Sequence, residues 1–329
     1  MTGKLQFYTT MSKFRFHYFL YALATILVTS CEDVVDLPID ESAKQLVIFS
    51  NFSDQNHLQV LVYKTKFINS KKPTEYVENA NVNVFADGIL LEKLHLVIPD
   101  SASGLFPYYQ STDLVPEYDK EYTIEVYVEG YDTITATNSI PTPVNIEEAV
   151  FTKDVQIDED GHNTEVSFFT SLSMRDPINI ENYYHLRFYQ ELIPFTLISP
   201  TDSLFGDTFF VYPNQVDLIG NNLSLTQYKY DQSQSYLIDD TLFDGQFITF
   251  QFNGKVMYDA SKLKPGRFII ELRTVSKDYY LYHESLNWQT AEGGSPHGPN
   301  GGVVFNNIDN GVGNFSGFTA KVNEFPLSK

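Results

Sequence analysis

Cysteine is almost absent from this chain: its 329 residues include one, Cys31, and a single tryptophan. A lone thiol has no partner for an intramolecular disulfide, so the sequence excludes a scaffold held together by disulfides. With 43% hydrophobic and 15% aromatic residues, the chain instead has enough apolar side chains to bury the core of one large domain or two ordinary ones.

Basic residues are also scarce. The chain has 22 Lys and Arg against 42 Asp and Glu, which gives a formal net charge of −20. Three of the basic residues, Lys4, Lys13 and Arg15, lie in an N-terminal region without acidic residues, so removing that region makes the chain more acidic still. Such a charge repels phosphate backbones and argues against nucleic acid as a partner.

The N-terminal apolar run, Tyr18 to Val28, is too short to cross a bilayer as a helix. It follows Lys13 and Arg15 and precedes small residues, an order typical of a secretory signal peptide. The segment "LVTSC" resembles a lipobox with Ser30 immediately before Cys31. We therefore expect a signal peptide over residues 1–30, cleavage between Ser30 and Cys31, and a diacylglycerol on the Cys31 thiol that holds the protein at a membrane.

Two features of this region stay open. Met11 would give a more typical signal length than Met1, so either residue is a candidate start. Residues 31–43 are acidic and predict a tether, and Glu32 and Asp33 loosely resemble the export signal of surface-displayed lipoproteins in Bacteroidota. A plain solvated linker is the alternative interpretation of these acidic residues.

Period-2 alternation dominates the rest of the chain. In "EYTIEVYVEGY", the side chains of Tyr122, Ile124, Val126 and Val128 share one face, which predicts a half-buried strand. Similar segments occur at Leu46–Phe52, Leu58–Tyr63, Asn81–Phe85, Thr133–Asn138, Glu165–Thr170, Tyr183–Gln190, Phe247–Phe252, Arg267–Thr274 and Phe318–Val322. Clusters such as Ala86-Asp87-Gly88 and Lys264-Pro265-Gly266 separate them as predicted turns, so we expect an all-β fold of sandwich or barrel type.

One helix is predicted near residues 277–290, where Ser276 provides an N-cap and Asp278 lies in the first turn. Tyr279, Tyr282 and Leu286 share one of its faces, which favours packing against a sheet. Pro141 and Pro143 interrupt the strand pattern and predict a domain boundary between residues 44–143 and 144–329.

A search for catalytic motifs gives mostly negative results. The six histidines after the signal region form no HExxH or His-x-His pair, which disfavours a zinc hydrolase; they are His57, His95, His162, His185, His283 and His297. Ser295 lies in a Gly/Pro-rich loop without the strand-serine-helix context of a nucleophile elbow. A glycosidase uses two carboxylates whose positions have no fixed spacing in the sequence. The possibility of such a pair therefore stays open.

Two loops are candidate binding elements. Asp158, Asp160 and Asn163 cluster oxygen ligands of the kind that hard cations prefer, although a polar β-turn explains the same residues and is favoured. The loop over residues 291–302 could clamp a ligand or partner, and a plain connection after the helix is the favoured alternative.

The order of several segments resembles a Bacteroidota lipoprotein family, that of domain of unknown function 4249. The matching segments are "CEDVVDLPI", "KQLVIFSNFSD", "VENANVNVFADG", "YDKEYTIEVYVEGYDTITATNSIPTPVNIEEAVF", "ENYYHLRFYQE", "VSKDYYLYHESL" and "VVFNNIDNGVGNFSGFTA". The resemblance covers essentially the whole chain after the signal region. It departs at Asn314, where a more apolar residue would be expected.

The resemblance implies an outer-membrane lipoprotein with an N-terminal immunoglobulin-like or carboxypeptidase-regulatory-like sandwich, followed by a second β-rich domain. It also implies an association with TonB-dependent transporters, and it supplies no catalytic residues. We therefore expect a non-enzymatic protein without a cofactor, lipid-anchored in the outer membrane with the surface face favoured, that helps such a transporter capture an unidentified ligand. A structural or adhesive envelope protein is the alternative, and an enzyme is the third candidate.

Overall fold

The computed structural model describes residues 44–66, 70–100, 103–158, 162–199, 202–220, 225–228, 233–291 and 303–327. The expected signal peptide, the Ser30-Cys31 cleavage site and the acidic tether therefore lie outside the described residues. Within the described part of the chain, no helix is both long and apolar enough to cross a membrane.

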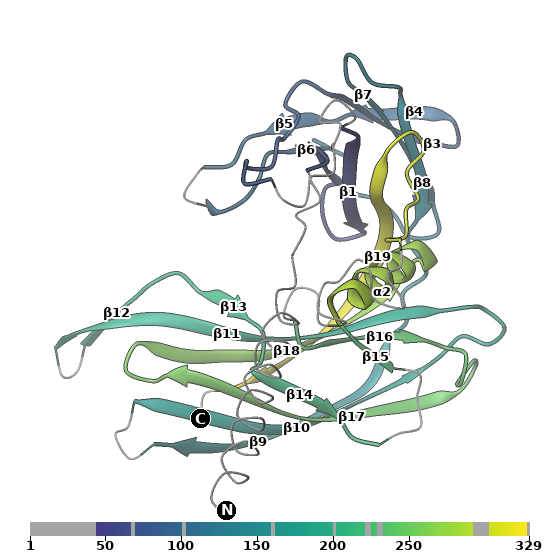
Figure 1. The fold of residues 1–329 in the computed structure, drawn as a ribbon. Helices are drawn as coiled ribbons and strands as arrows, with labels where there is room; N and C mark the ends of the chain where they lie inside the picture. Colours follow the sequence, from purple (N-terminus) through teal and green to yellow (C-terminus); the bar gives the residue numbers. More distant parts are fainter. Residues whose placement is uncertain are drawn as a thin grey trace, which may run out of the picture. The chain divides into compact units, whose positions relative to one another are not determined.

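The prediction of an all-β fold with one helix is confirmed: strands form three sheets, and a single α-helix accompanies them among the described residues (Figure 1). The largest sheet has eleven strands, and nine of them form a continuous path. In spatial order these are β15 (Leu225–Tyr228), β16 (Ser235–Asp239), β11 (Tyr183–Ser199), β18 (Leu263–Val275), β19 (Val312–Pro326), β1 (Leu46–Ser53), β2 (Gln59–Lys64), β6 (Tyr108–Gln110) and β5 (His95–Val97).

The remaining strands complete this sheet and build the other two. Two short strands, β12 (Asp202–Phe205) and β13 (Phe209–Val211), pair with β11 outside that path. The second sheet has the order β14 (Gln215–Leu218), β17 (Phe247–Asp259), β10 (Asn163–Arg175) and β9 (Ile146–Ile157). The third has the order β4 (Ile89–Lys93), β3 (Asn81–Ala86), β7 (Glu121–Tyr127) and β8 (Ile134–Ser139).

The first hydrophobic core lies between the third sheet and the β1-β2 part of the largest sheet. The alternation predicted for β7 is observed, because Tyr122, Ile124 and Val126 are fully buried while Glu125 and Tyr127 point outward. Each such fully buried side chain stabilises the fold by about 1.5–3 kcal/mol. Asp87 and Gly88 form the β3-β4 turn with positive φ angles of 51° and 72°, as the predicted turn requires.

The second core lies between the β9-β10-β17 sheet and strands β11 and β18. It is rich in phenylalanine: Phe268 has ring-centroid distances of 4.5 Å to Phe168 and 4.8 Å to Phe151, and Phe188 and Phe252 are also buried. Aromatic pairs at these distances add about 0.5–1.5 kcal/mol each beyond the burial of their area. This core therefore depends on ring packing more than the aliphatic first core does.

Strand β19 contributes to both cores. It pairs in parallel with β1 and antiparallel with β18 (Figure 1). Phe315 packs in the first core and Phe325 against the second. Gly313 approaches Ile48 so closely that an added Cβ would lie 2.0 Å from its carbonyl oxygen, which explains glycine there. From β1 to β18, the residues of the first core all precede residue 143 and those of the second core all follow it. Strand β19 instead contributes to both cores.

One predicted turn is wrong. Lys264, Pro265 and Gly266 lie inside β18, where the register with β11 shifts between Gln190 and Leu192. A bulge of this kind accommodates a proline within a strand, which the turn signal alone does not reveal.

The helix prediction is confirmed by α2, which runs from Lys277 to Ala291. The Ser276 hydroxyl accepts a hydrogen bond from the Tyr279 N–H at 3.3 Å, the N-cap geometry expected from the sequence. The Asp278 carboxylate accepts hydrogen bonds from Asn138 and Asn307 at 2.8 and 2.9 Å. These contacts fix the first turn of the helix next to β8 and the segment before β19.

Candidate functional site

A pocket of about 380 Å³ lies between α2 and one face of the largest sheet, and we call it the helix pocket. This volume is within the range of small-molecule sites. The lining side chains come from β1, β2, β11, β15, β18 and α2; they are Phe49, Asn51, Tyr63, His185, Arg187, Tyr228, Arg273, Tyr279, Tyr282, His283 and Leu286. Strand alternation explains why β11 presents polar side chains to this pocket. Leu186 and Phe188 of β11 face the second core, and His185 and Arg187 face the opposite side.

Two arginines lie in the wall of the helix pocket. Arg187 donates a hydrogen bond to the Tyr212 hydroxyl at 3.0 Å, and its guanidinium carbon lies 5.1 Å from the centroid of the Tyr189 ring. Its Nε atom is buried and has no hydrogen-bond acceptor within the described part of the chain. One donor of this guanidinium is therefore unsatisfied.

Arg273 is the second arginine. Its guanidinium carbon lies 4.2 Å from the centroid of the Phe318 ring, and its Nη1 donates to the Tyr279 hydroxyl at 3.3 Å. The Nε atom lies 3.0 Å from a Glu271 carboxylate oxygen but is not aligned for a hydrogen bond. Burial lowers the pKa of Arg273, while Tyr279 and Glu271 raise it more, so the net shift is upward and the group stays charged.

His185 is held in its neutral form. Its Nδ1 is hydrogen-bonded to the Tyr279 hydroxyl and its Nε2 to the Ser235 hydroxyl, both at 2.9 Å. Burial lowers its pKa well below the usual value, and the positive charge of Arg187 acts in the same direction. A neutral imidazole with both nitrogens hydrogen-bonded positions its neighbours and has no nitrogen left for a substrate proton or a metal.

His283 belongs to a second hydrogen-bond chain along the pocket. Asn51 donates from Nδ2 to His283 Nε2 at 3.2 Å, so this nitrogen is unprotonated and His283 Nδ1 donates to the Tyr228 hydroxyl at 3.0 Å. The Asn51 carbonyl oxygen accepts from Asn314 Nδ2 at 2.8 Å. The polar residue at position 314, which departs from the family resemblance, thus orients Asn51 toward the pocket.

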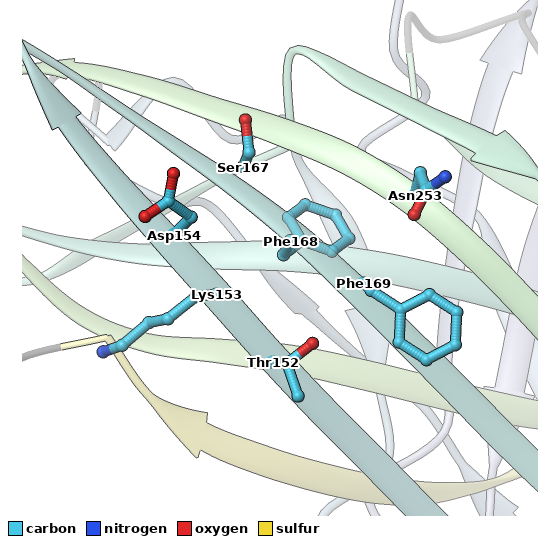
Figure 2. Close-up of a pocket in the computed structure, with 7 residues that line it drawn as sticks. All are labelled: Thr152, Lys153, Asp154, Ser167, Phe168, Phe169 and Asn253. Carbon is cyan, nitrogen blue, oxygen red and sulfur yellow. The ribbon is translucent and has the colours of Figure 1, made fainter.

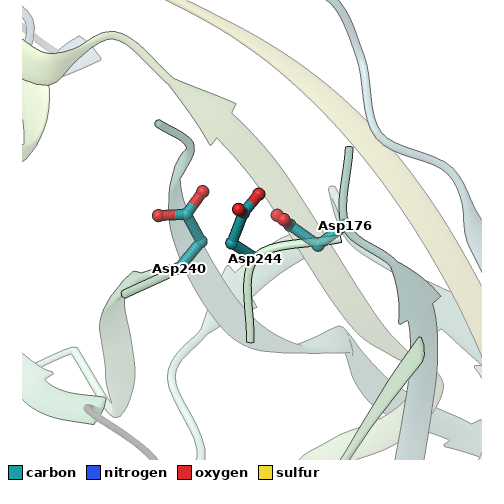
Figure 3. A group of neighbouring side chains, drawn as sticks. All are labelled: Asp176, Asp240 and Asp244. Carbon is teal, nitrogen blue, oxygen red and sulfur yellow. The ribbon is translucent and has the colours of Figure 1, made fainter. Parts of the chain in front are cut away.

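A second polar group, the aspartate cluster, consists of Asp176, Asp240 and Asp244, whose carboxylate oxygens lie within 4.8 Å of one another (Figure 3). Such oxygens suit a hard cation. The Asp176 carboxylate accepts hydrogen bonds from the Tyr184 hydroxyl and from the Gly245 N–H, the latter at 2.9 Å. These bonds tie the end of β10 to the segment before β17.

The other two carboxylates also accept backbone hydrogen bonds. Asp240 accepts from the Asn182 N–H at 2.7 Å, and Asp244 accepts from the N–H of Asn179, a residue with φ of 61°, at 2.8 Å. Burial raises the pKa of Asp240, and the negative charge of Asp176 raises it further. The cluster is therefore explained as a set of acceptors that fix a tight connection.

A third feature, the sheet pocket, lies on β9, β10 and β17 and also has a volume of about 380 Å³. Figure 2 shows its seven lining residues, which are Thr152, Lys153, Asp154, Ser167, Phe168, Phe169 and Asn253. The Lys153 ammonium donates to the carbonyl oxygens of Pro326 and Leu327 at 3.1 and 2.6 Å. The cationic group of this pocket is thus already used to attach the end of β19 to β9.

The sequence-predicted metal ligands are brought together only in part. The Asp158 carboxylate accepts hydrogen bonds from the backbone N–H groups of His162 and Asn163, and from Asn163 Nδ2 at 2.8 Å. These are the bonds of a polar turn. Asp160 and the candidate lipidation site Cys31 lie outside the described residues, and the metal site stays a prediction.

Sequence reasoning missed the helix pocket because its polar residues are far apart in the chain. A usable signal was present: Arg187 and Arg273 each lie in a strand segment rich in apolar residues. A charged side chain in a central strand is rare unless it is paired or functional.

The chain belongs to the family described as domain of unknown function (DUF4249), whose model matches residues 32–324. No curated protein matches the sequence. Among solved structures, the chain is similar to the C-terminal domain of the Streptococcus agalactiae AgI/II polypeptide BspA, with 13% identity, coverage of 70% of this chain and 94% of that one, and a TM-score of 0.12. The family match confirms the expected family, and the three sheets described above confirm the expected all-β fold class.

Proposed function

We propose that this protein is a non-enzymatic, lipid-anchored outer-membrane protein that captures a small ligand in the helix pocket for a TonB-dependent transporter. The observation that carries the proposal is a pocket of small-molecule size whose wall combines two arginines with five aromatic side chains. Pockets that bind small ligands combine aromatic and apolar surface with convergent polar groups, as this pocket does. The lipobox at Ser30-Cys31 and the family resemblance support the location and the transporter partner.

The hydrogen bonding of the two histidines favours binding over catalysis. Both ring nitrogens of His185 and of His283 are hydrogen-bonded to protein groups. A general base needs a free nitrogen within reach of the substrate proton. The same bonds hold Tyr228 and Tyr279 in place, and a wall held in this way binds a ligand without first having to be ordered.

The proposal is tested by purifying the native protein from detergent-solubilised outer membranes. We expect it to be recovered with a TonB-dependent transporter, and we expect a deletion strain to lose growth on one specific nutrient. Recovery of the protein alone in repeated preparations, with normal growth on all nutrients but reduced cell-surface adhesion, would favour a structural or adhesive envelope protein instead. Turnover in a broad hydrolase screen would contradict the non-enzymatic assignment.

The lipid anchor is tested separately. Radiolabelled palmitate should be incorporated into the wild-type protein and not into the Cys31→Ala variant, since the thiol is the expected attachment point. An unmodified Cys31 in the mass spectrum of the native protein would contradict the membrane location.

A further inference from the structure

We propose that the helix pocket binds a small organic carboxylate, with the anionic group held by the guanidinium groups of Arg187 and Arg273 and an apolar or ring-shaped body packed against the aromatic wall. This inference rests on the proposed function for the choice of site, and it specifies the chemical class of the ligand.

The first argument is charge. Two guanidinium groups line the pocket, and the ion-pair partner beside them is Glu271, which is not a lining residue. His185 is neutral, Asn51 donates a hydrogen bond to His283 Nε2, and the lining residues other than the two arginines and these two histidines have no ionised group at neutral pH. The pocket region therefore has one excess positive charge within a chain of net charge −20. A partly buried positive charge without a partner is costly, and an anionic ligand supplies that partner.

The second argument is hydrogen bonding. The Nε atom of Arg187 is buried and has no acceptor among the described residues, whereas the Nε atom of Arg273 already lies 3.0 Å from a Glu271 carboxylate oxygen. A buried donor without an acceptor is rare in folded proteins, so the Arg187 guanidinium keeps an unused donor that an entering ligand can satisfy. Carboxylate oxygens fit the planar donor fork of arginine.

The third argument is register. Arg187 on β11 lies opposite Glu271 on β18, and Arg273 follows Glu271 by two residues, so the two arginines are diagonal neighbours on one face of the sheet. Cα atoms of diagonal neighbours are about 7–8 Å apart, a distance that two long side chains can span to reach one carboxylate. A monocarboxylate also matches the single excess charge, whereas a phosphate monoester, near −2 at neutral pH, exceeds it.

The fourth argument is the remaining wall. Phe49 and Tyr282 pack with a ring-centroid distance of 5.9 Å, and Tyr63, Tyr228 and Leu286 extend the same apolar surface. Ring faces of this kind pack against alkyl chains and planar rings. The ligand is therefore expected to have a hydrophobic or ring-shaped body and not to be a bare inorganic anion.

The test is calorimetric titration of the full mature protein in detergent with three acids and their amides: benzoate and benzamide, 3-phenylpropionate and its amide, and hexanoate and its amide. We expect at least one acid to bind about ten- to a hundredfold more tightly than its amide, because hydrogen bonds to charged groups have that range of strengths. Equal binding of acid and amide in all three pairs, or tighter binding of phenyl phosphate than of benzoate, would overturn the proposal.

Variants locate the binding. Arg187→Gln should weaken binding of the preferred acid about tenfold or more, and Arg187→Lys should weaken it less because the charge is kept. Arg175→Gln is the matched control, since Arg175 lies on β10 with a side chain that is 61% exposed and does not line the pocket. Because Arg273 is paired with Glu271, its substitution could unfold the sheet, so Arg187 carries the test, with the melting temperature of each variant measured alongside.

The two proposals fail in distinguishable ways. Carboxylate binding that is lost in Arg187→Gln, in a protein that does not co-purify with a transporter, would support the ligand class and contradict the transporter role. Co-purification of a protein that does not distinguish acids from amides would contradict the ligand class alone.

Discussion

The two faces of strands β11 and β18 differ sharply in polarity. One face contains Leu186, Phe188 and Phe268, all buried in the second core, and the other contains His185, Arg187, Glu271 and Arg273 beneath α2. Because neighbouring residues of a strand point to opposite faces, the same strands supply both. The comparison separates the side chains that stabilise the sheet from those that are available to a ligand.

The largest expected effect comes from the apolar face. Phe268→Ala removes a fully buried ring that stacks with Phe151 and packs at a tilt against Phe168, and should lower the free energy of unfolding by about 3–5 kcal/mol. Urea denaturation measures this loss. The control Val322→Ala, at a half-exposed position across the strand pair from Glu271, should change stability by less than about 0.5 kcal/mol. Similar losses in both variants would contradict the assignment of the core.

A smaller effect on stability is expected in the hydrogen-bond chain that runs from Asn314 through Asn51 to His283 in the helix pocket. Asn314→Leu removes one of the two donors to the Asn51 carbonyl oxygen, the other being the Ser316 hydroxyl, and should cost about 1–3 kcal/mol, although the family resemblance predicts a more apolar residue at this position. Chemical denaturation of the two single variants and of Asn51→Leu/Asn314→Leu completes a double-mutant cycle, in which a coupling above about 0.5 kcal/mol is expected. A stabilised Asn314→Leu would show that the network is dispensable.

The pH dependence of stability tests the neutral state of His185. Its pKa in the folded protein lies well below the value of about 6.5 in the unfolded chain, so only the unfolded state takes up the proton as the pH falls through 6.5. Stability should therefore decrease by about 1.4 kcal/mol per pH unit below that value. His185→Gln should lose this slope between pH 6.5 and 5 in melting experiments. An unchanged slope in the variant would assign the effect to another group.

Much of the fold could be predicted from the sequence, because each half-buried strand carries its own alternation. The predicted segment 122–128 matches β7, whereas the prediction for Glu165–Thr170 covers only the middle of β10, which runs from Asn163 to Arg175. Short strands with exposed side chains, such as β4 and β12, were missed since alternation is a signal of burial. The double role of β19 depends on long-range pairing with β1, which leaves no local pattern.

The helix pocket could not be predicted for the same physical reason. His185 and Arg273 are directly opposite each other in the β11-β18 register, but they are far apart in the chain. His283 joins them only because α2 packs on that face. Arg187 and Arg273 are unusual in the sequence because they are charged residues in strands rich in apolar side chains. Only the register of β11 and β18 shows that they are neighbours.

The smallest expected effect concerns the aspartate cluster, the negative counterpart of the helix pocket. The pKa of Asp240 is raised in the folded protein by burial and by the negative charges of Asp176 and Asp244, so the folded state binds its proton more tightly than the unfolded state. Its contribution to stability is therefore present at low pH and is lost as the pH rises through the folded pKa. Asp240→Asn removes the repulsion and keeps an oxygen for the Asn182 N–H, so the melting temperature at pH 7 should rise slightly. A lower melting temperature would mean that the charge itself is needed, as it would be for a bound cation, and calcium titration of both proteins would then decide between repulsion and coordination.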